Sequence, residues 1–118
     1  MNIVGSEVLL VEDEIIIGFA LDDLVSDMGA HTTLVTTMEN AMSTLAVRQF
    51  DLAVLDVNLH GELTYPLADL LADQGCRFIF ATGYGSVTHP ERFASIPTVS
   101  KPYNSLEVFN ALKQTAKS

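Results

Sequence analysis

The sequence is poor in residues on which several classes of protein depend. Its 118 residues include one cysteine, no tryptophan, and six lysines and arginines against fifteen aspartates and glutamates. Because Cys76 is the only cysteine, no disulfide can form within the chain, and a secreted disulfide scaffold is excluded. The formal charge of −9 argues against a nucleic-acid partner, since phosphates are neutralised by basic residues.

The sequence offers no signal for a leader or for a membrane-spanning segment. The chain opens with no signal-peptide charge pattern, and no apolar run approaches the roughly 20 residues of a membrane-spanning helix. We therefore expect a reduced, cytoplasmic protein with no membrane partner. With 48% hydrophobic residues the chain can bury a core, and we expect one domain over residues 1–118.

Short apolar runs alternate with segments of helical periodicity. Strands are predicted at 7–12, 31–37, 51–57, 76–82 and about 97–100. Helices are predicted at 14–28, at 39–48, from Pro66 to a stop at Gly75, and at the end of the chain, with Leu106, Phe109, Leu112 and Ala116 on one face. This alternation predicts βα units and a doubly wound parallel sheet with helices on both faces.

Distinctive side chains stand where these strands end. Glu12 and Asp13 close the first strand, Asp56 the third and Thr82 the fourth, and Lys101 follows the fifth. Ligands of open α/β sheets bind beyond this edge, so we expect these groups to converge. Crowded carboxylates repel one another unless a cation lies among them, and oxygen ligands favour Mg²⁺, or Mn²⁺ in its place.

The same groups suit a phosphoryl group in transfer. Lys101 supplies positive charge, Thr82 a hydroxyl and Asp56 a carboxylate nucleophile. Each has a simpler explanation by itself: Asp13 and Asp56 as helix N-caps, Thr82 as a turn residue and Lys101 as a surface charge. Their combination, in this order on a βα pattern, favours the functional interpretation.

The motifs that carry these residues resemble a known family. The "ED" at Glu12 and Asp13, "LDVN" around Asp56, the Thr82 of "FATG" and the "KP" that begins at Lys101 are similar to the receiver domain of bacterial two-component response regulators. The resemblance covers essentially the whole chain. It implies a flavodoxin-like (βα)5 fold with strand order 2-1-3-4-5.

The resemblance also implies a chemistry. Asp56 would accept a phosphoryl group from the phosphohistidine of a sensor histidine kinase, and the chain would act as a switch, shuttle or sink in a phosphorelay. Mg²⁺ would be held by Asp13, Asp56 and the backbone carbonyl of Asn58, with Glu12 contributing directly or through water. Beyond self-phosphorylation and slow autodephosphorylation, no enzymatic activity is implied.

Three further positions take their roles from the same resemblance. Thr82 and Lys101 would contact the phosphoryl oxygens, and the Gly83 amide is a further candidate donor. The peptide bond before Pro102 is expected to be cis, an isomer that only X-Pro bonds adopt at low free-energy cost.

A narrower resemblance involves "FIFATGYG", "LDVNLHGE" and "YPLAD". These stretches are similar to the FATGUY subgroup of single-domain response regulators and to receivers attached to HWE-type sensor kinases. An HWE-type kinase is therefore the implied partner, and a phosphotransfer protein is a second candidate.

The chain departs from the receiver pattern in two places. Receivers carry Tyr or Phe three positions before the lysine, where this chain has Thr98; Tyr84 is the candidate to move in its stead, with a half-buried loop tyrosine as the alternative. The segment 83–97 is short and contains two glycines and two prolines, which predicts a short or irregular fourth helix.

Three other functions remain as alternatives. A Mg²⁺-dependent phosphatase with an aspartyl-phosphate intermediate would need a second acid two positions after Asp56, where the chain has Asn58. A flavodoxin-like cofactor carrier would need a Gly, Ser and Thr phosphate cradle, and the acids after the first strand would repel a phosphate. A receiver-like module that binds without phosphorylation would not need Asp56, Thr82 and Lys101 together.

Overall fold

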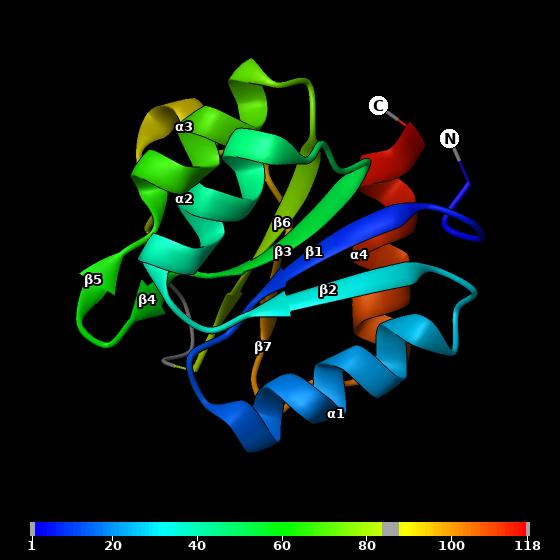
Figure 1. Cartoon of the computed structure of the whole chain (residues 1–118). Coiled ribbons are helices and arrows are strands. Elements are labelled where there is room, and N and C mark those ends of the chain that lie inside the picture. Colours follow the sequence, from blue (N-terminus) through cyan, green and yellow to red (C-terminus); the bar gives the residue numbers. More distant parts are fainter. Residues whose placement is uncertain (1, 84–87, 118) are drawn as a thin grey trace.

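A five-stranded parallel sheet lies between two layers of helices in the computed structural model, which describes residues 2–83 and 88–117 (Figure 1). The strands of this sheet are β1 (Glu7–Val11), β2 (His31–Val35), β3 (Leu52–Asp56), β6 (Arg77–Thr82) and β7 (Thr98–Ser100). Their order is β2-β1-β3-β6-β7. The predicted order 2-1-3-4-5 is confirmed, because β4 (Asn58–Leu59) and β5 (Glu62–Leu63) form a separate antiparallel hairpin.

Two helices cover each face of the sheet. Helices α1 (Ile15–Ser26) and α4 (Ser105–Lys117) lie on one face, and α2 (Met38–Val47) and α3 (Tyr65–Asp73) lie on the other (Figure 1). Within the described ranges, no helix has the length and apolar character needed to cross a membrane.

Two apolar clusters, one on each face, form the core. Along β1, Leu9 and Val11 join the cluster under α2 and α3, whereas Val8 and Leu10 join the cluster under α1 and α4. This alternation follows from the two-residue period of a strand. All five residues of the central strand β3 are buried. A central strand with helices on both faces has no solvent side, so its sequence is continuously apolar up to Asp56.

The final helix buries a different face from the predicted one. Its buried side chains are Val108, Ala111, Leu112, Thr115 and Ala116. Leu112 and Ala116 were predicted correctly, but Leu106 is 66% exposed and Phe109 is 36% exposed. The positions 108, 111, 112, 115 and 116 form one helical stripe, which points at the sheet and turns Leu106 away from it.

The connection between β6 and β7 contains no α-helix in its described residues. Three of these residues form a 3₁₀ turn, η1 (Glu91–Phe93). This agrees with the predicted short or irregular fourth helix. Phe93 is buried and anchors this turn in the cluster under α2 and α3.

Candidate functional site

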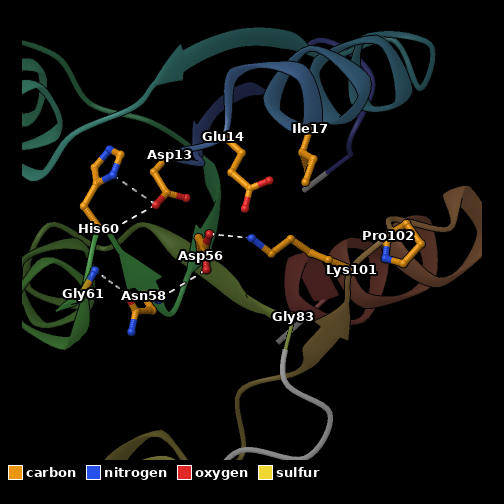
Figure 2. Close-up of a pocket in the computed structure, with 10 residues that line it drawn as sticks. All are labelled: Asp13, Glu14, Ile17, Asp56, Asn58, His60, Gly61, Gly83, Lys101 and Pro102. Carbon is orange, nitrogen blue, oxygen red and sulfur yellow. Dashed lines mark hydrogen bonds and ion pairs between the residues drawn. The ribbon is translucent and has the colours of Figure 1, made fainter.

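Asp56 lies at the carboxyl edge of the sheet, at the end of the central strand. Its side chain is almost fully buried, with the residue 3% exposed. One carboxylate oxygen, Oδ2, accepts a hydrogen bond from Lys101 Nζ at 2.7 Å, and Oδ1 accepts one from the Asn58 N–H at 3.2 Å (Figure 2). The Lys101 backbone N–H donates to the Thr82 carbonyl at 2.8 Å, which brings the lysine alongside the end of β6.

Glu12 follows β1 and is completely buried. Lys101 Nζ lies 3.1 Å from its Oε1 and 3.3 Å from its Oε2. The Tyr103 hydroxyl donates to Oε1 at 2.9 Å, and the Glu14 N–H donates to Oε2 at 3.1 Å. Every hydrogen bond of this carboxylate is thus made inside the protein, as burial of a charge requires.

Asp13 is the most accessible of the three acids. Its Oδ2 accepts a hydrogen bond from the His60 N–H at 2.8 Å, and the His60 ring Nδ1 lies 3.6 Å from the same oxygen (Figure 2). His60 has a φ of 50° at the tip of the β4–β5 hairpin, where Asn58 Oδ1 accepts from the Gly61 N–H at 2.7 Å. The hairpin therefore presents its backbone to the carboxylate.

The proton affinities of these groups reflect their crowding. The pKa of Asp56 is raised to about 6, chiefly because the carboxyl is buried; the hydrogen bond from Lys101 opposes this rise, and the charge of Glu12 adds to it. Burial alone would lower the pKa of Lys101, but hydrogen bonds to Asp56 and Glu12 raise it above its usual value. For Asp13, burial alone would raise the pKa, but hydrogen bonds, led by that from His60, lower it.

The three carboxylates meet closely enough to share a cation. Glu12, Asp13 and Asp56 each offer an oxygen, and these oxygens lie within 4.8 Å of one another. The lysine is the one cation among them in the described part of the chain. An oxygen-only set with excess negative charge fits a hard divalent cation such as Mg²⁺.

Two of these acids and the lysine border an open pocket, which Figure 2 shows with its lining residues; its volume is about 540 Å³. Asp13, Asp56, Asn58, Gly83 and Lys101 line it. Gly83 lies beside the lysine side chain: an added Cβ there would make an ordinary van der Waals contact of 3.7 Å with Lys101 Cε. The pocket has space for a small anionic group between the acids and the lysine.

The remaining predicted positions are placed as follows. Thr82 ends β6 and is 3% exposed, and the Lys101–Pro102 peptide bond is cis. Tyr84, the candidate moving tyrosine, lies outside the described residues. Thr98 begins β7 and is exposed, and it does not line the pocket.

Thr98 belongs instead to a second group of side chains, which we call the histidine bridge: Tyr65, His89 and Thr98. His89 Nε2 lies 2.7 Å from Thr98 Oγ1, and His89 Nδ1 lies 2.9 Å from the Tyr65 hydroxyl. The His89 ring rests on Phe80 with 4.4 Å between ring centroids. Burial lowers the pKa of His89, which favours a neutral ring that donates through one nitrogen and accepts through the other.

Sequence reasoning missed Tyr103 and the histidine bridge. Tyr103 stands two residues after Lys101, but this spacing alone does not tell in which direction its side chain points. His89 lies in an irregular segment without periodicity, where a bland loop histidine is the default interpretation. The predicted acids, Thr82 and Lys101 did have a signal in the sequence, because each stands at the end of a recognisable strand.

Comparisons with known proteins place this geometry in a family. No protein-family model and no curated protein sequence matches the chain. Among solved structures, SdrG from Sphingomonas melonis Fr1 is 32% identical, with 100% of both chains covered and a TM-score of 0.84. The receiver domain of the PhyR response regulator from Erythrobacter litoralis is 26% identical over 95% of this chain and 90% of that one, with a TM-score of 0.77.

A CheY-like receiver domain from Methanospirillum hungatei JF-1 shares the fold at 19% identity, over 96% of this chain and 94% of that one, with a TM-score of 0.81. The chain belongs to the receiver (CheY-like) domains of response regulators. Membership of this family makes it a signalling domain.

Proposed function

We propose that the chain accepts a phosphoryl group on Asp56 from the phosphohistidine of a sensor histidine kinase, and that it acts as a switch, shuttle or sink in a phosphorelay. The observation that carries the proposal is the convergence of a buried Asp56 with a lysine and two further carboxylates at one pocket. Three buried or half-buried acids against one cation are unfavourable for folding, which favours a functional reason for them.

The transfer itself needs an ionised Asp56. Its carboxylate oxygen attacks phosphorus, the bond from phosphorus to the histidine nitrogen breaks, and the electron pair of that bond returns to the nitrogen. A carboxylate with a raised pKa is a stronger nucleophile than an ordinary aspartate, and at neutral pH it is still mostly ionised. The product is an acyl phosphate on Asp56.

The other residues position and neutralise charge. In this proposal Lys101 exchanges its contact with Asp56 Oδ2 for a phosphoryl oxygen, and the Thr82 hydroxyl and Gly83 amide contact the remaining oxygens. Asp13, Asp56, the Asn58 carbonyl and Glu12, directly or through water, would hold Mg²⁺ or Mn²⁺, which neutralises charge on the phosphoryl group.

The proposal extends to partners and location. The resemblance of "FIFATGYG" to the FATGUY subgroup makes an HWE-type sensor kinase the donor that we propose, with a phosphotransfer protein as a further partner. A cytoplasmic location is part of the same proposal, since the one cysteine, Cys76, is buried as a free thiol and no disulfide requires an oxidising compartment.

Intact-mass spectrometry tests the assignment directly. The chain is incubated with Mg²⁺ and acetyl phosphate beside the Asp56→Asn variant, which keeps the shape of the side chain but cannot form an acyl phosphate. We expect one added phosphoryl group on the wild type, dependent on the metal, and none on the variant. If neither acetyl phosphate nor a phosphorylated HWE-type kinase gives an adduct, a binding-only receiver is the better interpretation.

A further inference from the structure

Tyr103 is the one tyrosine in the described residues whose hydroxyl reaches the acidic site. It lies between Lys101 and Asn104, whose Oδ1 caps helix α4 by accepting from the Glu107 N–H at 3.0 Å. The Tyr103 ring packs against the apolar cluster under α1 and α4. The backbone and ring of Tyr103 are therefore held by the fold, and the hydroxyl is aimed at Glu12.

The Glu12 carboxylate is one of the two acidic partners of the Lys101 ammonium. The lysine touches both Glu12 oxygens and Asp56 Oδ2. In the proposed transfer it would leave Asp56 for a phosphoryl oxygen, and of these contacts only those with Glu12 would remain to hold it. The direction of the Glu12 carboxylate thus decides where the ammonium lies.

We propose that Tyr103 is a positioning residue for phosphoryl transfer: its hydroxyl fixes the Glu12 carboxylate, and the fixed carboxylate holds Lys101 at the phosphoryl site. The inference rests on the proposed function. It adds a residue that is absent from the lining of the pocket and whose hydroxyl donates to Glu12.

The contacts of Glu12 show why one donor matters. Its carboxylate has three hydrogen-bonding partners: the ammonium, the phenol and the Glu14 N–H. The phenol is the partner that holds Oε1 independently of Lys101. Without it, Oε1 is held by the lysine alone, and only the Glu14 N–H on Oε2 still resists rotation of the carboxylate toward a cation beside Asp13 and Asp56. A buried carboxylate that can rotate no longer preorganises its partner.

The Tyr103 hydroxyl is suited to act as a permanent hydrogen-bond donor to Glu12. Burial, with the charge of Glu12 next in importance, raises the pKa of Tyr103 above its usual value, so the hydroxyl keeps its proton and stays a donor. A phenylalanine would fill the same space in the apolar cluster without needing a partner. The hydroxyl therefore acts on the carboxylate and not on the packing.

The test compares Tyr103→Phe with wild type and with the matched variant Tyr65→Phe. Tyr65 also uses its hydroxyl in one hydrogen bond, but to His89, away from the acids. The first measurement is the initial rate of phosphorylation by acetyl phosphate at saturating Mg²⁺. We expect Tyr103→Phe to be about tenfold slower, the effect of one hydrogen bond to a charged group, and Tyr65→Phe to keep the wild-type rate.

The second measurement reports the position of Lys101 without any phosphorylation. The sequence contains three lysines, at 101, 113 and 117, so ¹⁵N-lysine labelling gives a simple ammonium spectrum, which Lys101→Arg assigns. A buried, paired ammonium exchanges its protons slowly. We expect a Lys101 signal in wild type and Tyr65→Phe at low temperature, and its broadening or loss in Tyr103→Phe.

The outcomes separate the two proposals. If wild type takes no phosphoryl group from any donor, the proposed function fails, but the ammonium signal still tells whether Tyr103 fixes the lysine through Glu12. If Tyr103→Phe is phosphorylated at the wild-type rate, the positioning role is overturned, whatever its ammonium spectrum. A slower rate with an unchanged Lys101 signal also overturns it, since the effect would then bypass the lysine.

Discussion

Two polar networks sit near the carboxyl edge of the same sheet, and they are built on opposite principles. The acidic network, defined by Glu12, Asp13, Asp56 and Lys101, brings three carboxylates to one ammonium. The histidine bridge links Tyr65, His89 and Thr98 with neutral groups that each give or take a hydrogen bond. The acidic network carries excess negative charge, whereas the hydrogen-bonding groups of the histidine bridge are paired with one another.

This difference separates function from stability. In the acidic network the pKa of Asp56 is raised to about 6, so the folded state holds this carboxylate at a free-energy cost at neutral pH. A cluster of acids with such a free-energy cost implies a function that requires it. Binding a cation and a phosphoryl group would be such a function. The histidine bridge connects α3, β6 and β7 without an unpaired charge, and we expect it to stabilise the domain.

The strongest way to break the acidic network is Lys101→Ala in the absence of metal. Glu12 and Asp56 then lose their cation while staying buried, and we expect the free energy of unfolding to fall by about 3 kcal/mol near pH 7.5. Urea denaturation with a chelator measures it. Added Mg²⁺ should restore part of the loss, because the metal site keeps its carboxylates.

Lys113→Ala is the matched control for that variant. Lys113 is exposed, and its ammonium lies 5.7 Å from the centre of the Phe109 ring. We expect Lys113→Ala to leave the free energy of unfolding nearly unchanged. Equal losses in the two variants would mean that Lys101 does not neutralise the acids.

Asp56→Asn should act in the other direction. Because the folded pKa of about 6 lies above the ordinary value of 3.8, the stability that Asp56 contributes is present in acid and is lost as pH rises through 6. The side-chain amide of the Asp56→Asn variant does not titrate, so the variant avoids this loss of stability at neutral pH. Without metal, we expect the variant to be about 2 kcal/mol more stable than wild type near pH 7.5 and equal to it near pH 4. Denaturation curves at both pH values check the sign, and a variant less stable at neutral pH contradicts it.

His89→Ala tests the histidine bridge and should have the smallest effect of the three. It removes two hydrogen bonds and the ring contact with Phe80, for which we expect a loss of about 1–2 kcal/mol in the free energy of unfolding. Phosphorylation by acetyl phosphate should stay close to wild type. His31→Ala, at an exposed position, is the control. A strong loss of phosphorylation in His89→Ala would show that the two networks are coupled.

Much of the fold could be predicted because its signals are local. The continuous apolar runs at β1 and β3, and the glycines after α1 and α3, mark elements from neighbouring residues alone. The rotation of the last helix could not be predicted in the same way. Leu106 and Phe109 fit an apolar face as well as Val108 does, and only the position of the sheet decides between them.

The candidate site divides along the same line. The acids, the threonine and the lysine at the sheet edge could be identified from local sequence, because each stands at the end of a strand and parallel strands end together. The partner of each side chain depends on long-range packing: Glu12 and Tyr103 are 91 residues apart yet share a hydrogen bond, and His89 reaches Thr98 across an irregular segment. Periodicity depends on neighbours along the chain, whereas the pairing of buried polar groups depends on which elements pack together.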